Sequence, residues 1–188
     1  PWSVYASDLD GDGDNDLAVA NIYYDYVSIL KNHGSGTFAA RVDYVVGRYP
    51  CSVCASDLDG DGDRDLAVAN TSSNNVSILL NDGDGIFAAA ASYSAGDSPR
   101  AVYVSDLDGD GDIDLATANY NSGNVSILKN NGDGTFAAAA NYSAGTSPYS
   151  VFASDLDGDG DVDLAVANYS SDDVSIFKNI GDGAFSSK

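Results

Sequence analysis

The sequence predicts an all-β fold, namely a β-propeller built from four 49-residue blades of four strands each. An acid-rich segment of nine residues recurs four times at a fixed spacing of 49 residues, and the prolines keep that spacing, at Pro1, Pro50, Pro99 and Pro148. Between these marks, apolar and polar side chains alternate and are interrupted by Gly, Asn and Asp, which is typical of short strands. Repeated units of roughly 40–50 residues with strands and no helices are typical of propeller blades.

The prolines define the register of the repeats, and one repeat domain is expected to cover residues 1–188. Its blades are expected at residues 1–49, 50–98, 99–147 and 148–188. An antiparallel sheet of this size cannot bury both of its faces alone. Neighbouring blades must therefore cover them, which explains why the unit repeats.

Each repeat contains four short segments with strand character. The first three are predicted at residues 3–7, 16–21 and 26–30, with equivalents such as 101–105 and 124–128. The fourth begins after a Gly-rich turn at 132–136, with an Ala-rich run at 137–140. Because that run is only about one helical turn long and is flanked closely by Gly134 and Asn141, it is predicted as a strand.

The fourth repeat is eight residues shorter than the others. It stops at Lys188, where the first repeat continues into Val42-Asp43-Tyr44. We therefore expect the fourth blade to lack its outer strand and to leave residues 174–178 as an exposed edge. Such an edge recruits a strand from another copy and gives a homo-oligomer or a filament. In an alternative arrangement, the four blades belong to a larger ring that a second chain or a longer parent completes.

The acid-rich segments are predicted metal sites. Each packs five aspartates into nine residues, and carboxylates this close repel one another unless a cation neutralises them. Side chains at positions 1, 3 and 5, the backbone carbonyl at position 7 and a bidentate carboxylate at position 9 offer roughly six or seven oxygens, which suits Ca²⁺ better than Mg²⁺. About four calcium ions are expected, one per repeat. The predicted ligands are Asp8, Asp10, Asp12, Asp14, Asp16, Asp57, Asp59, Asp61, Asp63, Asp65, Asp106, Asp108, Asp110, Asp112, Asp114, Asp155, Asp157, Asp159, Asp161 and Asp163.

Other interpretations of these segments fit less well. An EF-hand requires Glu at position 12 and flanking helices, whereas position 12 is Val or Thr here and strands are predicted on both sides. Zinc, copper and iron prefer softer ligands, which the segments lack. Cys51 and Cys54 are expected to be small buried hydrophobic residues. Four solvated acidic hairpins without any metal stay open as an alternative.

The charge of the chain is concentrated in the same segments. The formal net charge is −21, and all 29 acidic residues are Asp, twenty of them in the four loops. A disordered polyanion is disfavoured, because 44% of the residues are hydrophobic and they alternate in an ordered way. Eight Lys and Arg residues cannot build a basic track for nucleic acid. No apolar run reaches the length of a membrane span.

Catalysis is not expected, and the chain is predicted not to be an enzyme. Its single histidine, His33, lies in a hairpin turn, and the equivalent positions hold Asp82, Asn131 and Ile180, so no acid–base role recurs. Glu is absent from the sequence. The paired aspartates are assigned to the metal, which keeps them ionised rather than poised near neutral pH.

The order of the motifs resembles that of a known family. Asp-x-Asp-x-Asp-Gly-x-x-Asp is followed by Leu-Ala-Val-Ala-Asn, Val-Ser-Ile-Leu and Gly-Asp-Gly-Thr-Phe, and over the whole chain this is similar to the FG-GAP/VCBS repeats. The resemblance implies a propeller like that of integrin α-subunits and certain fungal lectins. It also implies calcium between the first two strands of each blade, held by the aspartates named above, and an extracellular or cell-surface setting. The family usually closes rings of about seven blades, whereas this chain carries four.

The end of the blades opposite the calcium loops is a predicted recognition face. Strand order places the calcium loops and the Gly-rich turns at one end. The other end collects Tyr, Asn, Ser and Gly residues, at Tyr23, Tyr24, Tyr26, Tyr49, 70–75, Ser98, 120–123, Ser147, Tyr149 and 169–171. This composition is typical of adaptable recognition loops, although such residues also simply form turns. A glycan or protein ligand is a hypothesis for this face.

Three functions are consistent with these observations. The first is a calcium-stabilised extracellular module with a structural, adhesive or self-assembling role. The second is a carbohydrate-binding lectin that uses the Tyr-rich loops or the grooves between blades. The third is a fragment of a larger surface protein. Weak oxygen-ligand calcium sites fill readily outside cells, which favours an extracellular or cell-surface location for all three.

Overall fold

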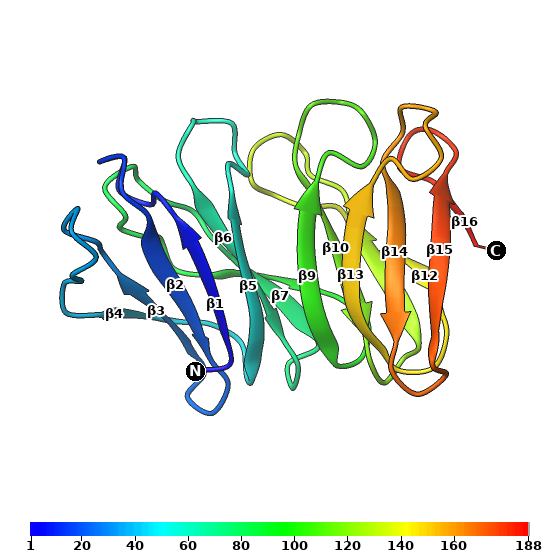
Figure 1. Cartoon of the computed structure of the whole chain (residues 1–188), viewed down its shortest axis with the longest axis horizontal. Helices are drawn as coiled ribbons and strands as arrows, with labels where there is room; N and C mark the ends of the chain where they lie inside the picture. The colour runs from blue at the N-terminus through cyan, green and yellow to red at the C-terminus, as the bar shows by residue number, and fades with distance from the viewer. Residues whose placement is uncertain (188) are drawn as a thin grey trace.

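The computed structural model describes residues 1–187 and consists of four antiparallel sheets that stand side by side (Figure 1). The first sheet contains β1 (Ser3–Ser7), β2 (Asp16–Asn21), β3 (Tyr26–Leu30) and β4 (Val42–Val45). The second contains β5 (Pro50–Ser56), β6 (Asp65–Asn70), β7 (Asn75–Leu79) and β8 (Ala91–Ser94). The third contains β9 (Pro99–Ser105), β10 (Asp114–Asn119), β11 (Asn124–Leu128) and β12 (Ala140–Ser143). The fourth contains β13 (Pro148–Ser154), β14 (Asp163–Asn168), β15 (Asp173–Asn179) and β16 (Phe185–Ser187). The predicted all-β fold of four blades is confirmed.

The three inner strands of each blade lie where their sequence pattern predicts them. In the first blade the bounds of β1, β2 and β3 agree with the predicted segments. The strand β2 has the sequence Asp-Leu-Ala-Val-Ala-Asn, and its small and branched side chains suit a pleated surface that is covered on both faces. It pairs with β1 on one side and with β3 on the other, and each pairing is antiparallel.

The outer strand of each blade begins later than predicted. In the third blade, Phe136 forms an isolated bridge with Asn130, and regular pairing resumes only at β12, where Ala140 lies opposite Ile127. The register shifts between these two pairings, so residues 137–139 form a bulge rather than a regular strand, although the Ala137 amide still donates to the Lys129 carbonyl at 2.8 Å. The Phe136 ring packs on Tyr93 of the second blade, with ring centroids 5.3 Å apart in an edge-to-face arrangement. The sequence of one blade does not reveal this contact with its neighbour.

The prediction that the fourth blade lacks its outer strand is wrong. The strand β16 pairs with β15, with Phe185 opposite Asn179 and Ser187 opposite Phe177. Pairing starts at Phe185, the position of the isolated bridge in the other blades, and continues without the bulge. Only the C-terminal half of β15 is covered in this way. Within residues 1–187, residues 173–176 of β15 still form an unpaired edge.

The hydrophobic core lies between the blades rather than inside one sheet. Three clusters of buried side chains occupy the junctions between the first and second, second and third, and third and fourth blades. Each junction also holds an edge-to-face pair of a Tyr and a Phe: Tyr44–Phe87, Tyr93–Phe136 and Tyr142–Phe185. Cys51 and Cys54 are buried and unbridged, as predicted for small hydrophobic residues.

The four blades form an open arc. Figure 1 shows the first blade at one end of the molecule and the fourth at the other, with the remaining two between them. The four blades therefore do not close a ring among residues 1–187. In the same part of the chain, no helix has the length and apolar character that crossing a membrane requires.

Candidate metal centres

The four acid-rich loops connect the first and second strands of each blade. In the first blade the loop leaves β1 after Ser7 and enters β2 at Asp16, which is the ninth loop position. The Gly-rich turns lie at the same end of the blades: the side-chain amide of Asn81, at the start of one such turn, donates to the carbonyl of Leu9 in the neighbouring loop, 2.8 Å away. The predicted sharing of one end by loops and turns is confirmed.

The aspartate at the ninth position is the buried anchor of the loop. Asp16 is 0% exposed, its Oδ2 accepts a hydrogen bond from the Leu9 amide at 3.0 Å, and its Oδ1 accepts one from the Asn32 amide at 2.7 Å. The same pair of bonds recurs at Asp65, Asp114 and Asp163. A buried carboxylate is unfavourable unless it is hydrogen-bonded, so these amides fix the side chain in place.

The aspartate at the first position shapes the turn. The Oδ1 of Asp8 accepts a hydrogen bond from the Gly11 amide and its Oδ2 accepts one from the Gly13 amide, both at 2.9 Å. Gly11 and Gly13 have φ angles of 73° and 92°, a left-handed conformation that glycine adopts without steric cost. The alternating glycines therefore let the backbone wrap around one carboxylate.

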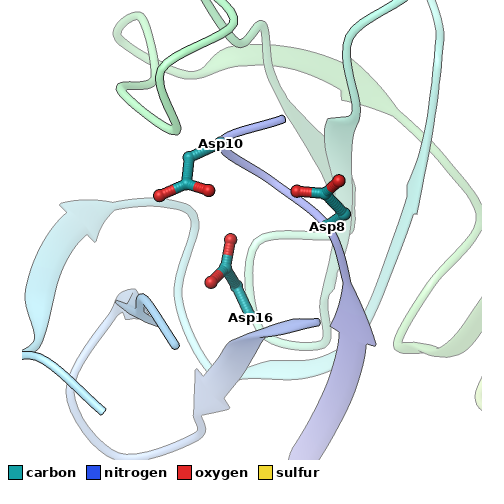
Figure 2. Close-up of side chains that lie close together, drawn as sticks. All are labelled: Asp8, Asp10 and Asp16. Carbon is teal, nitrogen blue, oxygen red and sulfur yellow. The ribbon is translucent and has the colours of Figure 1, made fainter. Parts of the chain in front are cut away.

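The aspartate at the third position points into the centre of the loop. Figure 2 shows the carboxylates of Asp8, Asp10 and Asp16 converging on one small space. A ligand atom from each of these residues lies within 4.8 Å of the others. The Oδ1 of Asp10 is buried and accepts no hydrogen bond within the described residues. An anionic oxygen without a partner in such a place is expected to have a cation as its ligand.

The residues present fit a hard divalent cation. Equivalent groups converge in the third and fourth blades: Asp106, Asp108 and Asp114, and Asp155, Asp157 and Asp163. In the second blade the converging group is Asp57, Asp59 and Asp61. All these ligand atoms are carboxylate oxygens, which Ca²⁺ and Mg²⁺ prefer and softer metals do not.

The predicted ligands at positions 5 and 7 lie at the rim of the loops. Among the four converging groups, position 5 contributes only in the second blade, through Asp61. The Oδ1 of Asp12 accepts a hydrogen bond from the Asp14 amide at 2.9 Å, and the same bond recurs in the other three loops. That the aspartates at positions 5 and 7 complete the coordination shell of an ion remains a prediction.

Sequence reasoning missed a lysine beside three of the loops. Lys31 lies 3.5 Å from the Oδ2 of Asp10, and Lys129 lies 3.1 Å from the Oδ2 of Asp108. Lys178 makes the equivalent contact in the fourth blade. The signal in the sequence is that each of these lysines directly precedes the Asn that opens the Gly-rich turn.

The second blade has Leu80 in place of this lysine. The aspartates at the third loop position differ in the fourth and second blades. The hydrogen bond from Lys178 lowers the pKa of Asp157, whereas burial, together with the charges of neighbouring aspartates, raises the pKa of Asp59. The loop of the second blade therefore has no built-in counter-charge of this kind.

Sequence reasoning also missed the asparagine that joins consecutive loops. The side-chain amide of Asn130 donates to the Leu58 carbonyl in the loop of the preceding blade at 2.7 Å, and to the Ile113 carbonyl in its own loop at 3.0 Å. Asn81 and Asn179 make the equivalent pairs of bonds. Each metal loop is thereby tied to the next blade.

We expect Asn130→Ala to lower the free energy of unfolding by about 1–3 kcal/mol, because the buried Leu58 carbonyl loses its donor. The matched control is Asn32→Ala. Among the described residues, the side-chain amide of Asn32 donates only to the Asn15 carbonyl of its own loop, at 3.1 Å, so a smaller loss is expected. Denaturant unfolding at saturating calcium measures both. Equal losses would show that the bond between blades contributes little.

Two of the ninth-position aspartates titrate near neutrality in the metal-free chain. Burial raises the pKa of Asp65 to about 6 and that of Asp114 to about 6, against the opposing effect of the two backbone hydrogen bonds on each. Their charged forms are therefore disfavoured in the folded state unless a cation compensates for the lost hydration.

The stability of the metal-free chain is accordingly expected to rise as the pH falls from about 7 to about 4, because the folded state then binds more protons than the unfolded state, in which Asp titrates near about 3.9. With excess calcium the opposite slope is expected, since protons compete with the ion for the same oxygens. Melting temperatures across this pH range, with and without calcium, test both slopes. Parallel slopes would contradict the assignment of these carboxylates to the metal.

A cavity lies at the opposite end, between the third and fourth blades. It has a volume of about 550 Å³ and is lined by residues of three loops, among them Tyr120, Ser122, Thr146 and Ser171. The Ser171 hydroxyl accepts a hydrogen bond from the Thr146 amide at 3.0 Å, which confirms that the predicted polar loops share this end. Tyrosines at this end are exposed, with Tyr23 at 74% and Tyr169 at 68%.

A family model for the FG-GAP-like repeat matches residues 8–68, 57–117 and 106–166. No curated protein matches the chain. Its structure is similar to that of an Agrocybe aegerita lectin described as specifically recognising non-reducing terminal N-acetylglucosamine, with 24% identity, a TM-score of 0.66 and coverage of 97% of this chain and 50% of the lectin.

Two further structures share the fold. BBS1N in complex with ARL6DN matches with 18% identity, a TM-score of 0.65 and coverage of 97% of this chain and 54% of that chain. The Vibrio cholerae biofilm matrix protein Bap1 matches with 21% identity, a TM-score of 0.57 and coverage of 97% of this chain and 29% of that chain. The chain therefore spans about half the length of the lectin and of BBS1N.

Proposed function

Because the chain belongs to the FG-GAP-like repeat family, we propose that it is a calcium-stabilised extracellular β-propeller module with a structural, adhesive or self-assembling role at a surface. The observation that carries the proposal is the recurrence of one acidic loop in all four blades. In each loop, carboxylates converge and the ninth aspartate is buried. The convergence of carboxylates, with the buried Asp10 Oδ1 lacking a hydrogen-bond donor within the described residues, supports a bound cation over solvated acidic hairpins.

Calcium would hold the loops through carboxylates such as Asp8, Asp10 and Asp16, and it supplies positive charge where the chain has crowded negative charge. Four ions would reduce the formal net charge from −21 to about −13. The loops in turn position the asparagines that cross to the next blade. We assign the ion a structural role rather than a catalytic one.

Native mass spectrometry of the 188-residue chain tests this proposal. We expect four bound calcium ions per chain in calcium-containing buffer, and loss of all four after treatment with a chelator. Magnesium at the same concentration serves as the control, because its small octahedral shell suits these loops less well. A chain that is folded and metal-free in excess calcium would overturn the proposal.

A carbohydrate-binding role is the second candidate. The cavity between the third and fourth blades supports it, because an aromatic residue, Tyr120, and polar residues such as Thr146 line it together. The similar fold of the N-acetylglucosamine-recognising lectin is consistent with this role. A glycan array tests it, with Tyr120→Ala expected to abolish any signal and Tyr24→Ala, an exposed tyrosine of the first blade, expected to leave it unchanged.

A further inference from the structure

Every junction between blades uses the same two faces. We name the side of a blade that packs on the following blade its forward face, and the side that packs on the preceding blade its backward face. In the first blade the forward face consists of Leu9, Ala18, Ala20, Val27 and Ile29, which are 0–2% exposed. In the second blade the backward face consists of Val53, Leu66, Val68, Leu79 and Phe87, which are 0–6% exposed.

The forward face of the fourth blade is uncovered. Its residues are Leu156, Ala165, Ala167, Val174 and Ile176, at the positions just named for the first blade. Leu156 is 48% exposed, whereas its equivalents Leu9, Leu58 and Leu107 are each 2% exposed. Val174 is 60% exposed, whereas its equivalents in the other blades are 0% exposed. This face has the composition of a junction but no following blade among the described residues.

The backward face of the first blade is uncovered in the same way. Val4 is 60% exposed, whereas its equivalents Val53, Val102 and Val151 are 4–6% exposed. Phe38 is 38% exposed, whereas its equivalents in the other three blades are 6–7% exposed. The two ends of the arc thus carry the two complementary halves of one junction.

The polar groups of a junction are also divided between the two ends. At the internal junctions an asparagine amide reaches the loop of the preceding blade, but within residues 1–187 no amide reaches the equivalent Leu156 carbonyl. The side-chain amide of Asn32, the equivalent asparagine of the first blade, donates only to the carbonyl of Asn15 in its own loop in that part of the chain. Lys31 and Lys129 donate to turn carbonyls of the following blade, whereas Lys178 contacts Asp157 of its own blade.

We propose that the first blade of a second copy of this chain covers the fourth blade of the first copy, head to tail, and reproduces an internal junction. This deepens the self-assembling role named above and rests on calcium-ordered loops, because Asn32 of one copy would donate to the Leu156 carbonyl in the loop of the other. It replaces the expected donation of a strand to β15 with the packing of whole faces. Four blades from each of two copies close a ring if the rotation allows it, and otherwise the copies extend into a filament.

Sedimentation velocity of the full chain in excess calcium tests the proposal, over a range of protein concentrations. We expect dimers or longer assemblies for the unmodified chain. Val4→Asp and Val174→Asp each place a charge in one face and should raise the dissociation constant by about a hundredfold or more, because the charge would be buried on association. Both side chains are 60% exposed within the chain, so the variants should fold, which their melting temperatures check.

Ile86→Asp is the matched control. Ile86 is 55% exposed in a turn of the second blade and belongs to neither face. The Ile86→Asp variant should therefore assemble like the unmodified chain. An equimolar mixture of the Val4→Asp and Val174→Asp variants is decisive. Each variant keeps one intact face, and the two intact faces are complementary, so the mixture should form a heterodimer although each variant alone is monomeric.

The outcomes separate this proposal from the proposed function. A calcium-loaded chain that stays monomeric at all concentrations would overturn head-to-tail packing of two copies and leave the calcium role intact. Assembly that is insensitive to Val4→Asp and Val174→Asp would also overturn it. A chain that binds no calcium contradicts the proposed function instead.

Discussion

Removal of calcium by a chelator is expected to lower the melting temperature of the protein by about 20–40 °C. A ligand that binds only the folded state at a hundred times its dissociation constant contributes about 2.7 kcal/mol per site, so four sites contribute about 11 kcal/mol. In a chain of this size, 1 kcal/mol shifts the melting temperature by about 2–4 °C. Such a contribution is comparable with the whole stability of a typical domain.

The physical reason is the crowding of carboxylates in each loop. Without an ion, Asp10 keeps a buried oxygen that lacks a partner, and the charges of neighbouring aspartates raise the free energy of the folded state. Differential scanning calorimetry with and without chelator measures the effect, and re-addition of calcium should restore the original transition. A melting temperature that is the same with and without chelator would show that the loops fold without a metal.

Asp114→Asn is expected to be the most damaging single substitution, with a loss of about 3–5 kcal/mol and one calcium ion fewer per chain. The two oxygens of Asp114 accept hydrogen bonds from the Leu107 amide at 3.0 Å and the Asn130 amide at 2.8 Å. An asparagine has one oxygen and one NH₂ group, so one of these two donors would face another donor in a buried place.

Asp112→Asn is the control in the same loop, because this position is expected to offer only its backbone carbonyl, which asparagine keeps. The melting temperature measured by calorimetry and the calcium stoichiometry should therefore change little. If the two variants lose the same stability and the same amount of calcium, the ninth position is not the anchor of the site.

The sequence alone could predict the structural features that depend on residues within one repeat. The bounds of β2 and β3 follow from local alternation, and the loop geometry follows from the spacing of Asp8, Gly11 and Gly13. These features depend on neighbours within about a dozen residues, which the repeat presents four times.

What could not be predicted depends on contacts with the next blade. The aromatic contacts between blades are one example: Phe136 packs on Tyr93 and Phe185 packs on Tyr142, and the two rings of each pair are separated by most of a repeat. Lys31 directly follows β3 and approaches Asp10 across the blade, so spacing along the chain does not show the contact.

The asparagine side chain that links two loops always comes from the following blade. The four loops are therefore not equivalent. The loops of the first three blades are braced by a following asparagine, whereas Asp155 and Asp157 in the last loop are exposed. If the loops hold calcium as proposed, we expect the ion of the last loop to leave first as calcium becomes scarce, and unfolding to begin at the fourth blade. A second copy packed on the fourth blade would protect this loop. Calcium binding and self-association would then stabilise each other.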